Sequence, residues 1–111
     1  MIRVTVVRKN GNITGYYAKG HAEYADLGND IVCAAVSTVM QNPLAGIQEV
    51  LGLNPQYGFD DDGYITVTLD RMNFQGKEKE VSSLLETMVV MIRELERNYP
   101  KNIKLVEKEE K

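Results

Sequence analysis

Alternating apolar and polar positions open the chain and predict a β-hairpin. Residues 2–8 place apolar side chains at every second position, beginning with Ile2, as a strand with one buried face requires. Asn10-Gly11 follows, and both residue types tolerate the positive φ of a tight hairpin turn. Residues 13–18 form the second predicted strand, which pairs with the first.

Two later segments have helical patterns. Residues 31–51 are apolar nearly all round at their start, which is typical of a buried helix, and Asp30 is placed to cap the first turn. Asn42-Pro43 is expected to kink or interrupt this helix, because proline lacks an amide hydrogen and its ring clashes with the preceding turn. Residues 79–99 carry one apolar stripe and form the clearest amphipathic helix.

A second hairpin is predicted around Asp60-Asp61-Asp62-Gly63, between strands at residues 56–59 and 64–69. The acidic run suggests calcium, but a calcium loop with Gly63 at its sixth position would need oxygen ligands at Gly58 and Leu69. Neither side chain has an oxygen. The run is therefore interpreted as a hairpin turn.

A short last strand is predicted over residues 102–106, and the mixed-charge run 107–111 is expected to be a frayed, solvated tail. The element order is β-β-α-β-β-α-β. Two hairpins favour an antiparallel sheet, and helices this apolar need that sheet to pack on. The sequence predicts an α+β fold, with a mostly antiparallel sheet and two helices in a single domain over residues 1–111.

Composition narrows the class of protein. The chain has 111 residues, 43% hydrophobic and 26% charged, with a net charge of −3, so a broad surface for nucleic-acid phosphates is not expected. No stretch approaches the ~20 apolar residues of a membrane span. A single cysteine forms no internal disulfide, so nothing indicates an oxidising compartment and a cytoplasmic protein is expected. One histidine and one cysteine cannot complete a zinc site without Asp or Glu, so no metal or cofactor is expected.

The candidate chemistry lies in one short segment that holds the only histidine, His21, and the only cysteine, Cys33. Cys33 falls in the first turn of the predicted helix, where unpaired backbone amides favour a thiolate and offer donors to an oxyanion. His21, at the exit of the second strand, is placed to take the thiol proton and return it to a leaving amine. The non-catalytic interpretation is a buried, inert cysteine and a structural histidine.

Four further residues are given supporting roles. Asp30 is first an N-cap and second a group that orients His21. Ser37 lies one turn beyond Cys33 and is a candidate hydrogen-bond donor near the site, although it also suits close helix packing. Gly20 and Gly28 are expected points of bending in a loop that closes over or admits substrate.

Gly20-His21-Ala22 and Gly28-Asn29-Asp30-Ile31-Val32-Cys33-Ala34-Ala35-Val36-Ser37 resemble the signature of the ribosomal-processing cysteine protease family, often called Prp. The resemblance covers essentially the whole chain. It implies a bacterial cytoplasmic endopeptidase, commonly a homodimer, in which the family's histidine matches His21 and its nucleophile matches Cys33.

The implied substrate is a large-subunit ribosomal protein, the twenty-seventh in the standard naming, from which the enzyme removes a short N-terminal extension. Because such an extension ends in aromatic residues, it needs an apolar groove, with Tyr16, Tyr17, Tyr24 and Val36 as candidate walls. The alternatives are a non-catalytic ribosome-associated protein-binding module, and a thiol hydrolase or acyltransferase acting on another substrate.

Overall fold

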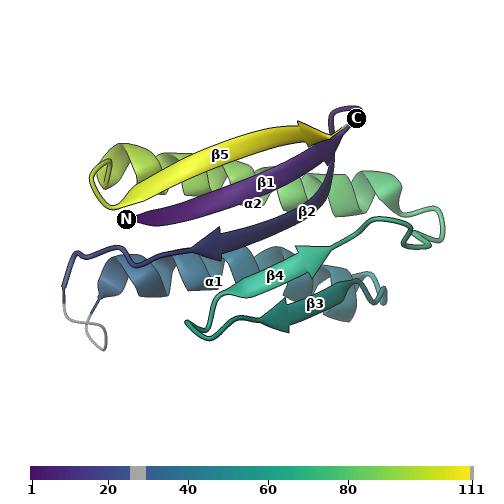
Figure 1. The fold of residues 1–111 in the computed structure, drawn as a ribbon. Coiled ribbons are helices and arrows are strands. Elements are labelled where there is room, and N and C mark those ends of the chain that lie inside the picture. The colour runs from purple at the N-terminus through teal and green to yellow at the C-terminus, as the bar shows by residue number, and fades with distance from the viewer. Residues whose placement is uncertain (26–29, 111) are drawn as a thin grey trace.

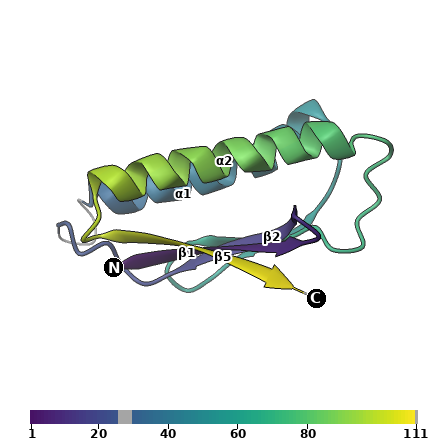
Figure 2. The ribbon, with the colours of Figure 1, turned by 90° about the horizontal axis from the view of Figure 1, so that it is seen from above.

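The computed structural model describes residues 1–25 and 30–110, which form two layers. A five-stranded sheet carries both long helices on one of its faces (Figures 1 and 2). The elements in order are β1 (Ile2–Lys9), β2 (Asn12–Lys19), α1 (Ile31–Ala45), the π-helical segment η2 (Gly46–Val50), β3 (Gln56–Phe59), β4 (Ile65–Thr68), α2 (Glu78–Asn98) and β5 (Ile103–Glu110). The predicted fold class and element order are confirmed.

The sheet has the strand order β3-β4-β2-β1-β5. Its neighbouring pairs are antiparallel except for β1 and β5, which run parallel along their full lengths. The predicted first turn is confirmed, because Asn10 and Gly11 have φ values of 53° and 82°. The order brings the β3–β4 hairpin to the edge of the sheet opposite β5 (Figure 1).

The core lies between the helices and the sheet, where alternate strand residues meet the apolar helix faces. From β1 the buried side chains are Ile2, Val4 and Val6, as the alternation predicts. The predicted stripe on α2 is also buried and comprises Val81, Leu85, Met88, Val89 and Ile92. These residues belong to a single buried cluster that covers both layers.

Residues 107–110 are not a frayed tail, and Lys111, the last residue of the predicted tail, lies outside the described residues. β5 continues through Glu110, which pairs with Lys9 of β1, so the expected short strand was too short. Arg8 explains this order: its guanidinium contacts Glu107 at 2.9 Å and makes a two-pronged pair with Glu86 of α2, at 2.7 and 2.8 Å. Hydrogen bonds from Arg8 hold the pKa of Glu86 below its usual range.

Pro43 does not interrupt the first helix. α1 runs through it to Ala45, and the change of winding comes at η2, which begins at Gly46. The Gly46 amide contacts both Asn42 and Pro43 carbonyls, so the chain remains helical past the proline. Gly52, with φ of 69°, follows the end of this segment, as expected for a helix stop.

Neither α1 nor α2, nor any other helix in residues 1–25 and 30–110, combines the length and the apolar character that crossing a membrane requires.

Candidate active site

Asp30 caps the start of α1 and organises the backbone beside it. Its Oδ1 accepts hydrogen bonds from the Val32 and Cys33 amides at 2.9 and 3.1 Å. Its Oδ2 accepts from the Tyr24 and Ala25 amides at 3.0 and 3.3 Å. Burial opposes ionisation, but the four amide donors outweigh it and hold the pKa of Asp30 below its ordinary value. The predicted capping role is confirmed.

The same contacts overturn one expectation about the helix start. The Val32 and Cys33 amides are occupied by the Asp30 carboxylate, and the Ala34 amide donates to the Asp30 carbonyl at 3.2 Å. The amides beside the thiol are therefore not unpaired donors waiting for an oxyanion. The predicted N-cap side chain occupies the Val32 and Cys33 amides, and the backbone carbonyl of the same residue occupies the Ala34 amide.

Cys33 is half-buried, and its sulfur has a hydrogen-bond donor from another element. The hydroxyl of Tyr64 donates to Cys33 Sγ at 3.4 Å. Tyr64 stands just before β4 and is only 3% exposed, so its hydroxyl is held in a packed side chain rather than on a mobile surface group. Burial, followed by this hydrogen bond, raises the pKa of Tyr64.

His21 leaves β2 and faces the β3–β4 turn. Its Nε2 lies 3.4 Å from Asp62 Oδ1, and both side chains are close to half exposed. Gly20 sets this exit, because its φ is 92° and a Cβ there would lie 2.4 Å from the Met1 carbonyl oxygen. Gly20 is thus a close backbone contact. The carboxylate that reaches His21 is that of Asp62, whereas the oxygens of Asp30 bind backbone amides.

A single open cavity of about 370 Å³ brings these groups together. It is lined by His21, Asp30, Cys33, Ala34, Ser37, Asp61, Asp62 and Tyr64. Four of the predicted residues, His21, Cys33, Asp30 and Ser37, are therefore neighbours in space. Gly28, which was predicted together with Gly20 as a point of bending in the loop, lies outside the described residues.

The described part of the loop after His21 is held at several points. Asn102 donates to the Ala22 carbonyl at 2.7 Å, and the rings of Tyr24 and Tyr99 meet edge to face at 5.5 Å. Together with the Asp30 contacts, these fix residues 22–25 against the helix start and the turn before β5.

Two of the candidate groove walls are buried in the core. Tyr16 and Val36 are both 0% exposed, and the Tyr16 hydroxyl donates to the Met40 carbonyl at 2.8 Å. They cannot contact a peptide, because the alternation that made Tyr16 available on a strand also turned it toward α1. Tyr24 is 50% exposed and remains accessible.

The contribution of the β3–β4 hairpin to the site was not predicted from the sequence. The Asp60–Gly63 turn is confirmed, since Asp60 Oδ1 accepts from the Asp62 and Tyr64 amides at 2.9 Å each. This turn delivers Asp62 and Tyr64 to the cavity. The alternation placed Tyr64 with the polar residues of its strand, and the only local signal of a special role was an aromatic residue directly after an acidic turn.

Within residues 1–25 and 30–110, no three His, Cys, Asp or Glu side chains are grouped as ligands of one ion. Two carboxylates of the cavity are already engaged, Asp30 with backbone amides and Asp62 with His21.

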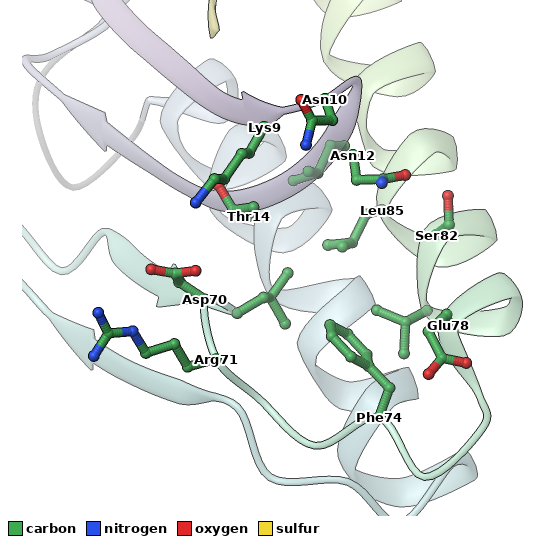
Figure 3. A pocket seen from close by; sticks show the side chains of 13 residues that line it. Lys9, Asn10, Asn12, Thr14, Asp70, Arg71, Phe74, Glu78, Ser82 and Leu85 are labelled. Atoms are coloured by element: carbon green, nitrogen blue, oxygen red, sulfur yellow. The ribbon is translucent and has the colours of Figure 1, made fainter. Parts of the chain in front are cut away.

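Another cavity, of about 290 Å³, shares no lining residue with the cavity of the thiol. Figure 3 shows its lining side chains. This cavity is enclosed by the β1–β2 hairpin, the segment after β4 and the first half of α2, with Asn12, Phe74 and Ser82 among its lining residues. None of the candidate chemical groups lines it. The cavity at the start of α1 is therefore the one in which the sequence-predicted residues meet.

A half-buried thiol and an imidazole line one open cavity on this two-layer α+β fold, and these are the two groups that a thiol-dependent hydrolase requires. A family model described as cysteine protease Prp matches residues 1–104. The chain therefore belongs to the cysteine protease Prp family. The predicted family and enzyme class, a cysteine protease, are confirmed.

Similar proteins support the same assignment. The ribosomal processing cysteine protease Prp of Staphylococcus aureus is 32% identical over 108 residues, which are 95% of this chain and 97% of that protein. The protein of the same name from Bacillus subtilis is 27% identical over 107 residues, 95% of this chain and 96% of its own length.

Solved structures agree in fold along the whole chain. The S. aureus protease in complex with a covalently linked product peptide superposes with a TM-score of 0.84 at 29% identity, covering 97% of this chain and 100% of that one. A Streptococcus mutans protein superposes with a TM-score of 0.83 at 27% identity, covering 99% and 96%.

Proposed function

We propose that this protease removes the N-terminal extension of a large-subunit ribosomal protein, the twenty-seventh in the standard naming, and so supports ribosome assembly. The relatives named ribosomal processing cysteine protease supply the substrate class. The S. aureus structure with a substrate peptide supports peptide binding on this fold. The observation that carries the proposal for this chain is the shared cavity of its single cysteine and single histidine.

In the proposed mechanism Cys33 is the nucleophile and His21 is the acid–base group. His21 takes the thiol proton, Cys33 Sγ attacks the scissile carbonyl carbon, and the carbonyl electron pair moves to oxygen. The intermediate then collapses to a thioester as the carbon–nitrogen bond breaks and His21 protonates the leaving amine. Water, deprotonated by His21, releases the new carboxylic acid and restores the thiol.

The His21–Asp62 contact favours different roles for the two imidazole nitrogens of His21. Nε2 faces Asp62, which leaves Nδ1 as the nitrogen for the thiol proton. Ser37 and Asp30 support the site by position: Ser37 lines the cavity, and Asp30 holds the start of the helix that carries Cys33.

The test uses the ribosomal protein in its extended form as substrate. Wild-type protein is expected to release the extension, and mass spectrometry of both products gives the cleavage site. Cys33→Ala and His21→Ala are expected to release none over the same time. Ser83→Ala, an exposed change on α2, is the matched control and should cleave as wild type does.

The alternatives separate in the same assay. A protein-binding module binds the extended protein and leaves it uncut, and a hydrolase for another acyl substrate neither binds nor cuts it. We also propose that the protein pairs with a second copy of itself, because the family resemblance implies a homodimer. The proposed location is the cytoplasm. Sedimentation at micromolar concentration checks the dimer, and a monomer there would contradict it.

A further inference from the structure

Acyl transfer needs a hydrogen-bond donor for the oxyanion, and three described backbone amides at the start of α1 are not free to be that donor. An oxyanion needs hydrogen-bond donors aimed at the place where its charge develops. The amides of Val32, Cys33 and Ala34 already have acceptors within the cap that Asp30 makes. Among the described residues, a donor other than these three amides must therefore serve the oxyanion while this cap is in place.

Tyr64 has the position for this task. Its hydroxyl lies 3.4 Å from Cys33 Sγ, and Cys33 and Tyr64 line the same cavity. In a tetrahedral intermediate the oxyanion and the sulfur are bonded to the same carbon, so a donor already in contact with the sulfur is within a small rotation of the oxygen. The Tyr64 side chain is packed, which fixes the origin of that rotation.

We infer that Tyr64 is a catalytic residue that donates its hydroxyl hydrogen first to the Cys33 sulfur and then to the oxyanion of the substrate carbonyl. This inference rests on the proposed function of Cys33 as nucleophile. As sulfur bonds to the carbonyl carbon, negative charge leaves sulfur for the carbonyl oxygen, and the hydrogen bond follows it. No proton leaves Tyr64, so the step adds no group to the balance given above.

The chemistry of Tyr64 suits a donor that never becomes a base. Burial and the contact with Cys33 raise the pKa of Tyr64, so the hydroxyl keeps its hydrogen over the pH range in which a thiolate forms. A neutral donor also adds no charge to a cavity that already holds the carboxylates of Asp30, Asp61 and Asp62.

The experiment compares two reactions of the same thiol in Tyr64→Phe. Acylation by p-nitrophenyl acetate passes through an oxyanion, whereas alkylation by iodoacetamide does not. At a pH where alkylation has reached its plateau, we expect acylation to fall roughly 100-fold, the typical effect of one lost oxyanion donor, and alkylation by less than about threefold. A peptide that spans the proposed cleavage site of the extended ribosomal protein is called the extension peptide. Its turnover should fall by the same factor as acylation, and the loss should appear in kcat rather than in KM.

Tyr16→Phe is the matched control. Tyr16 is also a buried tyrosine with a hydroxyl hydrogen bond, but its acceptor is the Met40 carbonyl rather than the sulfur. Its acylation and alkylation rates should equal those of wild type. Circular dichroism at the assay temperature verifies that both variants are folded. Where Tyr64→Phe does not fold, Tyr64→3-fluorotyrosine replaces it; this more acidic donor should change the acylation rate and leave alkylation as it is.

Two results would overturn the inference. Equal losses in acylation and alkylation would mean that Tyr64 acts on the thiol alone, and unchanged acylation would mean that it serves neither step. Failure of the proposed function looks different, since wild-type protein would then leave the extension peptide uncut while the two small probes still report on Tyr64.

Discussion

Replacing Asp30 by asparagine separates the two halves of its carboxylate. Asparagine keeps one oxygen, which can still accept from the Val32 and Cys33 amides and cap α1. Its amide NH₂ replaces the other oxygen and faces the Tyr24 and Ala25 amides, which are also donors. The change therefore removes the tether of residues 22–25 and leaves the helix cap.

The expected cost follows from the contacts that are lost. A hydrogen bond to a charged group contributes about 1.5–3 kcal/mol, and the 3.3 Å bond from Ala25 belongs at the low end. The loss of both bonds should lower the free energy of unfolding of Asp30→Asn by about 3–4.5 kcal/mol. Asp30→Ala should lose about 1 kcal/mol more, because alanine also loses the cap. A domain of this size has roughly 5–15 kcal/mol in total, and the middle of this range exceeds both losses, so both variants should fold.

Urea denaturation followed by circular dichroism, at pH 7 and at steps down to pH 2, measures this cost. Because the pKa of Asp30 is lower in the folded state, its contribution is fully present above the unfolded pKa. The contribution disappears as the pH falls through the folded value. The difference between wild type and Asp30→Asn should therefore be largest at neutral pH and shrink below about pH 4.

Equal unfolding free energies for wild type and Asp30→Asn at pH 7 would refute this reasoning. A difference that persists undiminished at pH 2 would also refute it, because protonation of Asp30 in the unfolded chain below about pH 4 must by then have reduced the contribution.

Three further changes have defined outcomes. Gly20→Ala should destabilise the fold by about 2 kcal/mol or more, because the new Cβ would lie 2.4 Å from the Met1 carbonyl oxygen. Gly11→Ala is the control, because Gly11 has a similar φ but open space around it, so alanine there bears only the strain of positive φ. Equal losses of thermal stability in the two variants would contradict this. Arg8→Ala should cost about 1–2 kcal/mol and speed amide exchange at the end of β5, and unchanged exchange there would show that Arg8 does not hold the strand. Asp62→Ala should lower kcat/KM by about fivefold or less, because its pair with His21 is half exposed, and a loss as large as that of His21→Ala would assign Asp62 a larger role.

The parts of the fold that sequence analysis predicted are the ones set by local pattern. The alternation of apolar residues identified β1, Asn10-Gly11 identified the turn after it, and the apolar stripe identified α2. Each of these patterns depends on residues that are close together in the sequence. The thiol and imidazole were found for a similar reason. Each residue type occurs once, and the two lie twelve positions apart at the ends of predictable elements.

The parts that were missed depend on contacts between distant segments. Tyr64 reaches Cys33 across 31 positions because β4 pairs with β2 and the hairpin turn lies beside α1, and no periodicity encodes that placement. β5 extends to Glu110 because it pairs with β1, and Glu107 reaches Arg8 across 99 positions. The prediction that the amides at the start of α1 are free for an oxyanion was wrong. The same amide hydrogens were expected both to be capped by Asp30 and to bind the oxyanion, and the cap occupies them.

The proposed protease mechanism depends most directly on a covalent bond between Cys33 and the substrate. Acid quenching of wild-type protein during turnover of the extension peptide, followed by digestion and mass spectrometry, tests this. We predict an acyl group of the mass of the released extension on the peptide that contains Cys33, absent from Cys33→Ala. Cleavage that proceeds in Cys33→Ala, or an acyl group found only at another residue, would contradict the account.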